Sequence, residues 1–225
     1  MKYLVQYSGG LQSFECARRV IEKHGKENVE LWFADTMDED EDLYRFNRDV
    51  EKLLGVKIRV FCYGMNLWEL FDSDRFIANS RADICSRKMK RELLQDGLVD
   101  YKGSDITIVL GMDWQEPHRI KKAEKFWVKY NVVFPLNDSF YGPFIFNNKI
   151  EDYLKENGIE IPRMYKLGFS HNNCGGACVK AGKGQWVHLL KTLPDRFKYH
   201  EERERESGNL KSVKITPSIR LRKKV

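Results

Sequence analysis

The residues Ser8–Ser13 (SGGLQS) place two serines and two glycines where an apolar run gives way to a helical pattern. Glycines let the backbone turn sharply and expose its N–H groups, and serine hydroxyls add further donors. The helix that follows would point the positive end of its dipole at the same spot. This stretch predicts a cradle for phosphate oxygens, although a glycine turn with a serine N-cap has the same composition. It lacks the Gly-Lys-Ser/Thr of a Walker loop and the spaced glycines of a dinucleotide fold.

Thiols form the second group of residues that could take part in chemistry. Cys174 and Cys178 lie in a glycine-containing loop whose backbone could wrap an inorganic centre. The chain has five cysteines, and an odd number in a chain of this size without a signal sequence favours reduced thiols or metal ligands over disulfides. Cys16 falls on the apolar face of a helical pattern and Cys62 at the end of a strand pattern, so we expect both to be structural.

The elements that must position these groups alternate along the chain. Strand patterns cover residues 3–7, 29–34, 56–62, 106–111 and 131–134. Helical patterns cover residues 11–23, 42–54, 68–98, 115–126, 150–157 and 185–205. This order predicts an α/β fold with a doubly wound, mostly parallel sheet and ligands at the carboxyl ends of its strands. We expect a nucleotide-binding core over residues 1–135 and a C-terminal extension over 136–225, together forming one compact domain.

Composition narrows the function classes. No apolar run approaches the roughly 18 residues of a membrane helix, so we expect no membrane partner. The first residues lead directly into a strand pattern instead of a signal sequence, which predicts a cytoplasmic protein. The formal net charge is +6, and residues 211–225 carry six lysines or arginines without an acidic residue. This basic tail would suit either nucleic-acid contact or a solvated terminus.

Five motifs follow one another in order. Ser8–Ser13 is similar to Ser-Gly-Gly-x-x-Ser, and Phe33–Thr36 to Phe-x-Asp-Thr. Cys85–Lys88 resembles Cys-x-x-Arg-Lys, and Gly111–Arg119 resembles Gly-x-Arg-x-x-Glu-Ser-x-x-Arg. Pro135-Leu136, Met164–Phe169 and Cys174–Cys178 then follow the order Pro-Leu, Leu-Tyr-x-x-Gly, Cys-x-x-Cys. On these motifs the chain resembles the PP-loop ATP pyrophosphatase (adenine nucleotide alpha hydrolase) superfamily, in its phosphoadenosine phosphosulfate reductase-like branch.

The resemblance implies ATP and Mg²⁺ as cofactors, with a substrate oxygen attacking the α-phosphorus and pyrophosphate leaving. It implies catalytic roles for Arg119, Asp35 and Lys88. The expected nucleotide-binding residues are Ser8, Gly9, Gly10, Gln12, Ser13, Asp35, Thr36, Arg87, Gly111, Glu116 and Arg119. Many relatives have Asp at the position of Gln12, where it helps to hold magnesium; Asp35 or the acidic residues 38–42 would supply the carboxylate here.

The resemblance also brings Cys85 close to Cys174 and Cys178. Three thiolates can hold a [4Fe–4S] cluster, or zinc with His171 as a fourth ligand, and the alternative is three unligated thiols. The spacing between the last two cysteines is Cys-x₃-Cys instead of the usual Cys-x₂-Cys. Related PP-loop enzymes thiolate tRNA or the DNA backbone, so the resemblance implies sulfur chemistry.

Three functions stay open. The first is an adenylating sulfur transferase that acts on a nucleic acid (tRNA or DNA) or a nucleotide, for which the aromatic segment Phe140–Phe146 would suit a nucleic-acid partner. The second is a sulfonucleotide enzyme, against which stands the lack of any cysteine after Cys178. The third is a nucleotide-binding module without catalysis. A homodimer or a partner protein is compatible with each.

Overall fold

The computed structural model describes residues 1–101 and 105–207. The chain forms two compact units, each assembled from several stretches of sequence. The first contains Met1–Ala34, Glu41–Phe61 and Leu94–Arg163, and the second contains Asp35–Asp40, Cys62–Leu93 and the residues from Met164 onward. The basic tail, 211–225, lies outside the described residues. The domain division at residue 135 stays a prediction.

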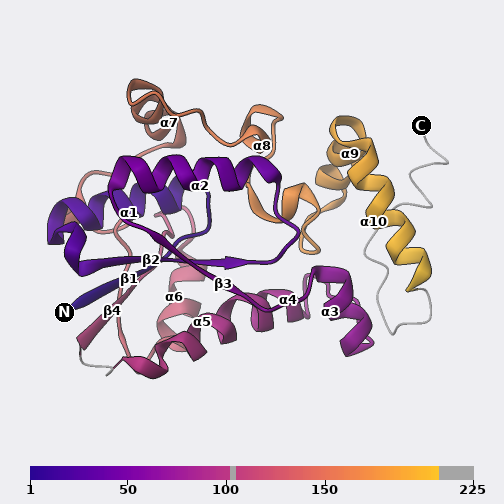
Figure 1. The fold of residues 1–225 in the computed structure, drawn as a ribbon, viewed down its shortest axis with the longest axis horizontal. Coiled ribbons are helices and arrows are strands. Elements are labelled where there is room, and N and C mark those ends of the chain that lie inside the picture. Colours follow the sequence, from indigo (N-terminus) through magenta and orange to yellow (C-terminus); the bar gives the residue numbers. More distant parts are fainter. Residues whose placement is uncertain (102–104, 208–225) are drawn as a thin grey trace. The chain divides into compact units, whose positions relative to one another are not determined.

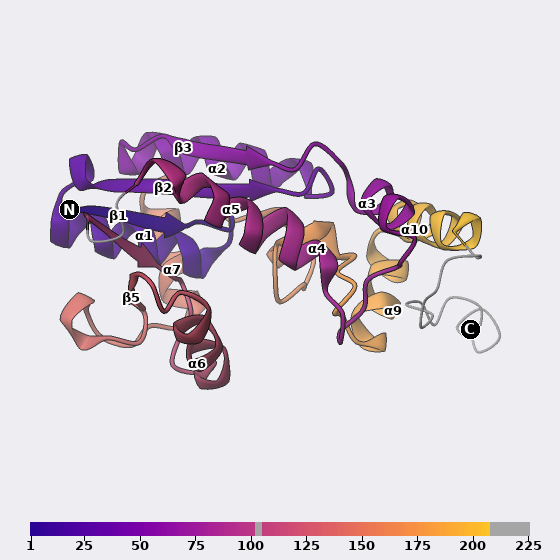
Figure 2. The same cartoon turned by 90° about the horizontal axis from the view of Figure 1, so that it is seen from below.

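A five-stranded parallel sheet forms the centre of the first unit. Its strands are β1 (Lys2–Gln6), β2 (Val29–Asp35), β3 (Ile58–Cys62), β4 (Ile106–Val109) and β5 (Asn131–Val133). Their spatial order is β3-β2-β1-β4-β5, and in Figure 2 β3 and β5 lie at opposite edges. The strand order reverses between β1 and β4, and ligands of such sheets bind outside the carboxyl ends of the strands at this switch point. Ser8–Ser13 leaves the sheet here, at the end of β1. The predicted doubly wound fold is confirmed.

Helices cover both faces of this sheet (Figure 1). The helices of one face are α1 (Leu11–His24), α2 (Glu41–Leu54) and α7 (Asn147–Glu156), which packs on α1. On the other face, α5 (Leu93–Asp96), the 3₁₀ turn Gly97–Asp100 and α6 (Pro117–Phe126) lie over the strands. There Leu4, Trp32 and Ile108 pack against Leu98 and Trp127. Because both faces are covered, the central strands are apolar on both sides, as the buried run Ile106–Val109 shows.

The second unit consists mainly of short helices. They are α3 (Leu67–Asp74), α4 (Ile84–Ser86), a π-helical stretch (Arg87–Glu92), α8 (Arg163–Lys166), a 3₁₀ turn (Asn173–Gly176), α9 (Lys183–Thr192) and α10 (Pro194–Glu206). One apolar cluster contains Trp68, Cys85 and Cys174, and another contains Met164 and Phe197. These clusters hold the cysteine-containing loop against the helices of this unit.

A buried histidine links α3 and α10 within the second unit. Trp68 donates from Nε1 to Nδ1 of His200 at 3.0 Å. Burial, aided by the positive charge of Arg196, lowers the pKa of His200 to about 4. The ring is therefore neutral at pH 7, which its acceptor role requires.

Two predicted helices are divided. The prediction of one helix over 185–205 is wrong, because α9 ends at Thr192 and α10 begins at Pro194. Proline lacks an N–H and clashes inside a helix, but it fits the first turn. The helical region 68–98 is interrupted after Asp74, since Arg75 adopts a left-handed conformation (φ 50°) that ends α3.

Within residues 1–101 and 105–207, no helix combines the length and apolar character needed to cross a membrane.

Candidate functional site

The Ser8–Ser13 loop is organised around one oxygen atom, the side-chain Oγ of Ser13. This atom accepts hydrogen bonds from the Ser8 N–H (3.1 Å), the Ser8 hydroxyl (3.1 Å) and the Gly10 N–H (3.2 Å), and it donates to the Gly10 carbonyl (2.9 Å). A hydroxyl oxygen has two lone pairs, so it cannot fully satisfy three donors at once. At least one donor can therefore turn to an oxygen of a ligand, at the N-terminus of the 14-residue helix α1.

Two glycines permit the close packing of this loop. Gly9 has a φ of +75°, and a Cβ built on it would lie 2.9 Å from the side chain of Leu43 on α2. A Cβ on Gly111, which follows β4, would lie 3.2 Å from the Cα of Ser13. Both positions therefore favour glycine, one for conformation and contact and the other for contact alone.

Gln12 is joined to a carboxylate that the sequence prediction did not include. Its Nε2 donates to Oδ2 of Asp113 at 2.7 Å, and the other oxygen of Asp113 accepts from the Gln115 N–H at 2.9 Å. Asp113 is buried, with 7% of its surface exposed. Two features of the sequence signal it: it follows a buried strand by only a few residues, and it departs from the Gly-x-Arg of the motif that Gly111–Arg119 otherwise resembles.

Glu116 and Arg119 meet at the start of α6. The guanidinium of Arg119 forms an ion pair with Glu116 and remains half exposed. The second oxygen, Glu116 Oε2, is buried and has no hydrogen-bond partner among the described residues. Such an atom loses its hydration without compensation, so it is suited to accept a hydrogen bond from a ligand hydroxyl. His118, in the same turn, is exposed.

The remaining predicted nucleotide residues lie in the second unit. Asp35 accepts from the Met37 N–H at 2.8 Å, and the Thr36 hydroxyl donates to Glu39 at 3.0 Å. Lys88 pairs with Asp74 at 2.7 Å, whereas the pair between Arg87 and Glu92 is long, at 3.8 Å, and exposed. Each of these side chains contacts another group of this chain, and their roles toward a nucleotide stay predictions.

Cys174 lies in a strained turn beside a buried carboxylate. Its φ of 49° is left-handed, and its N–H donates to Glu39 Oε2 at 2.5 Å. Glu39 also pairs with Lys90, whose Nζ lies 3.5 Å away. Burial alone would lower the pKa of Lys90, but the negative charge of Glu39 and the three neighbouring thiols Cys174, Cys178 and Cys85 raise it above its ordinary value. Lys90 therefore stays charged close to the thiols.

The thiols differ in acidity. A hydrogen bond from Cys174 lowers the pKa of Cys178 to about 6, against the opposing effect of burial, with the Lys180 N–H and the charges of Lys90 and Lys180 assisting. Burial and the charge of Cys178 raise the pKa of Cys85. Cys16 is fully buried in α1 and its pKa is raised, whereas Cys62 is exposed at the end of β3. The structural assignment of Cys16 thus agrees with its burial.

Cys178 should be alkylated by iodoacetamide with a rate that rises through about pH 6 and is level above about pH 7, because the thiolate is the nucleophile. A thiol at the ordinary value of 9.0 would still gain reactivity at higher pH. Mass spectrometry of peptides labelled over a pH series measures this rate, with the exposed Cys62 as the internal comparison. Cys174→Ala removes the hydrogen bond and should move the Cys178 profile to higher pH; an identical profile in this variant would contradict the assignment.

A metal centre at Cys85, Cys174 and Cys178 stays a prediction. Among the described residues, no three His, Cys, Asp or Glu side chains are arranged to hold a metal ion. His171, the proposed fourth zinc ligand, is exposed. The present arrangement does not fit a cluster or a zinc ion without movement of these side chains, so no chemical step is derived through either.

No protein-family model and no curated protein sequence matches the chain. Its structure is similar to the crystal structure of a phosphoadenylyl-sulfate (PAPS) reductase from Candida auris in a phosphate complex. The TM-score is 0.50, with 16% sequence identity over 76% of this chain and 80% of that chain. At this identity the likeness shows the fold alone, which is like that of the PAPS reductase. The resemblance predicted from the motifs is confirmed at that level.

Proposed function

We propose that this protein binds ATP at the Ser8–Ser13 loop and adenylates an acceptor, with release of pyrophosphate, as part of sulfur transfer to a nucleic acid or a nucleotide. The observation that carries the proposal is the crowded Ser13 oxygen, on which more donors converge than it can satisfy. Phosphate oxygens offer additional lone pairs to such donors, and the dipole of α1 favours their negative charge. The loop would hold the β- and γ-phosphates.

Glu116 and Arg119 support a nucleotide as the ligand. The half-exposed guanidinium of Arg119 has donors left for phosphate oxygens, for which its planar geometry is suited. The unpartnered Glu116 Oε2 would accept a hydrogen bond from a ribose hydroxyl. Together they would orient the α-phosphate relative to the acceptor, and positioning of this kind supplies much of the rate in phosphoryl and nucleotidyl transfer.

Asp113 is the carboxylate that we propose in place of the missing loop Asp. Each of its oxygens accepts one hydrogen bond and keeps a lone pair, and carboxylate oxygens are preferred ligands of Mg²⁺. Mg²⁺, when bound with ATP, would neutralise charge on the leaving pyrophosphate. Gln12 would then act as the residue that orients Asp113.

The proposed reaction balances in two steps. An acceptor oxygen attacks the α-phosphorus, the bond from that phosphorus to the bridging oxygen breaks, and pyrophosphate leaves while the acceptor proton passes to solvent. A sulfur nucleophile from a donor molecule then displaces AMP from the adenylated acceptor.

Asp113→Asn should lower nucleic-acid-dependent pyrophosphate release by about 10- to 100-fold and raise the Mg²⁺ concentration needed for half-maximal rate. The substitution keeps an amide oxygen that can accept the hydrogen bond from Gln12, but it removes the negative charge. Glu22→Gln on α1, where the carboxylate is 71% exposed and pairs with Arg18, is the control for the loss of a surface charge and should retain the wild-type rate. Equal rates for both variants would remove Asp113 from the proposal.

Calorimetry with ATP and Mg²⁺ tests the proposal itself. Absence of ATP binding to the wild-type protein would sink it. Turnover of 3′-phosphoadenosine 5′-phosphosulfate with a thiol donor, without ATP cleavage, would identify a sulfonucleotide enzyme instead. Tight ATP binding without either reaction, with RNA and DNA supplied, would identify a nucleotide-binding module.

A further inference from the structure

Three aromatic side chains from two distant segments of the sequence meet at the surface of the first unit. Trp114, Phe144 and Phe146 are 39%, 61% and 58% exposed. The ring centre of Trp114 lies 5.9 Å from the ring centre of Phe144 and 5.9 Å from that of Phe146. The angle between the ring planes is 40° in the first pair and 84° in the second. We call these three residues the aromatic patch. Large apolar side chains that gather at a surface usually mark a binding site.

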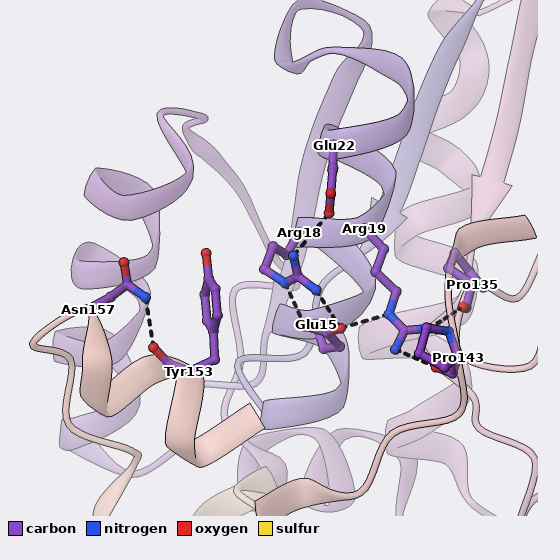
Figure 3. Close-up of polar contacts among 8 residues, drawn as sticks. All are labelled: Glu15, Arg18, Arg19, Glu22, Pro135, Pro143, Tyr153 and Asn157. Carbon is purple, nitrogen blue, oxygen red and sulfur yellow. Dashed lines mark hydrogen bonds and ion pairs between the residues drawn. The ribbon is translucent and has the colours of Figure 1, made fainter. Parts of the chain in front are cut away.

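A buried ion pair holds the segment that leads into the patch (Figure 3). Arg19 Nε lies 2.7 Å from Glu15 Oε1, and both side chains are almost fully buried in α1. The same guanidinium donates to the Pro135 carbonyl at 3.2 Å and to the Pro143 carbonyl at 2.8 Å. Because its donors lie in one rigid plane, Arg19 fixes the chain immediately before Phe144. The exposed rings are thus presented on a fixed backbone.

The patch begins next to the proposed nucleotide site. Trp114 directly follows Asp113, which Gln12 joins to the Ser8–Ser13 loop. The turn around Trp114 is closed by the Gln115 N–H on the Asp113 side chain and by the Glu116 N–H on the Asp113 carbonyl, at 2.9 and 3.1 Å. A group that stacks on Trp114 would therefore lie close to the loop that holds the phosphates.

The chain that follows Trp114 is basic. Residues 114–130 include five lysines or arginines and two glutamates, and Lys121, Lys122 and Lys125 are exposed on α6. Phe146 is the N-cap of the ten-residue helix α7, which lacks a side-chain cap. Lys149 in the first turn of α7 pairs with Asp152 at 3.2 Å and is 67% exposed. This combination of exposed rings with positive charge matches a ligand that has flat apolar groups on an anionic backbone.

We infer that the aromatic patch stacks unpaired bases of a single-stranded nucleic acid whose phosphates contact the lysines of α6 and α7. The inference rests on the proposed function, for which it names the acceptor: a single strand or an unpaired loop, with its target nucleotide close to the Ser8–Ser13 loop. Bases in a duplex are stacked on one another and do not offer their faces to such rings. A purely apolar partner would make no use of the exposed lysines of α6.

Fluorescence anisotropy with a labelled single strand of about 12 nucleotides tests the inference on the full chain. Trp114→Ala, Phe144→Ala and Phe146→Ala should each weaken binding by about 5- to 100-fold, the range measured for loss of one base-stacking ring. Trp114→Phe should retain most of the affinity. Binding should also weaken steeply with salt, since lysine contacts to phosphates release counterions.

Phe140→Ala is the matched control. Phe140 lies in the same segment with similar exposure, 56%, but packs against Lys23 and Tyr141 outside the patch. It should leave oligonucleotide affinity within about 2-fold of the wild type, well below the loss expected for one stacking ring. Equal effects of Phe140→Ala and the patch variants, equal affinity for duplex and single strand, or no oligonucleotide binding would overturn the inference.

Two further measurements separate the possible failures. The patch variants should bind ATP as the wild type does in calorimetry; if ATP binds and the oligonucleotide result is negative, only the inference fails. If ATP does not bind, the proposed function fails, and the anisotropy series still decides the role of the patch. Sedimentation velocity that shows the patch variants dissociating a dimer, with oligonucleotide affinity unchanged, would assign the patch to a second copy of the chain.

Discussion

Arg19→Met is expected to lower the free energy of unfolding by about 3 kcal/mol, because removal of one partner from a buried ion pair leaves the other charge without full compensation. Glu15 would keep only Arg18, which binds it at 2.8 and 2.9 Å from a position 26% exposed. The carbonyls of Pro135 and Pro143 would lose the donor that holds them. Denaturant titration followed by circular dichroism measures the loss.

The neighbouring arginine supplies the control for this prediction. Arg18 lies on the same helix and contacts Glu15, Glu22 and the ring of Tyr153, but it contacts neither proline carbonyl (Figure 3). Arg18→Met should cost about 1 kcal/mol, as expected for a partly exposed pair. Equal losses for the two variants would show that the hydrogen bonds from Arg19 to the two proline carbonyls do not contribute to stability.

Limited proteolysis tests the same two hydrogen bonds independently. Chymotrypsin should cut the Arg19→Met protein faster between residues 140 and 146, where the aromatic side chains are exposed. Arg19→Lys should behave in between, because an ammonium group can pair with Glu15 but cannot reach both carbonyls in the fixed geometry of a guanidinium. Cleavage that is no faster than in the wild type would show that Arg19 is not needed to keep this segment ordered.

Gly9→Val is expected to reduce ATP affinity by more than about 100-fold, because the proposed phosphate loop can adopt its conformation and its close packing only when residue 9 has no Cβ. A β-branched residue at φ +75° is strained by about 1–3 kcal/mol. Its Cβ would also meet Leu43 at 2.9 Å and Asn47 at 3.2 Å, so that the loop must move away from α2. Calorimetric titration with ATP and Mg²⁺ measures the loss.

Gly64→Val separates strain from function. Gly64 has a similar φ of +83°, but a Cβ there would have no atom within 4 Å. Both variants should lose stability through backbone strain, whereas only Gly9→Val should lose nucleotide affinity. Wild-type ATP affinity in Gly9→Val would refute the assignment of Ser8–Ser13 as the phosphate loop.

Local signals explain why much of the fold could be predicted. Strand and helix periodicities are properties of short windows, and each of the five predicted strands overlaps a strand of the sheet. Their alternation restricts the topology to a doubly wound parallel sheet, because crossovers between parallel strands have one hand. The divided helix near Pro194 was also readable locally, from a proline that cannot lie inside a helix.

The turn at Ser8–Ser13 was predictable for the same reason. Its glycines and serines are adjacent in sequence, so the turn at the end of β1 carries its own donors. The partner of Gln12 was not predictable, because Asp113 lies 101 residues away and is brought there by the pairing of β1 with β4. The local sequence therefore indicates only that the loop lacks a carboxylate, and the substitutes it offers are Asp35 and residues 38–42.

The sequence by itself thus determined the order of strands and helices, the loop that offers N–H groups and hydroxyls, and the presence of three thiols in suitable motifs. The tertiary structure decided which distant side chains act together. It placed Asp113 beside Gln12, set Cys178 near Lys90, and joined Trp114 to Phe144 and Phe146. The physical reason is that hydrogen bonds, pKa shifts and ring contacts act over a few ångströms in space, and only the folded backbone brings residues so far apart in sequence within that range.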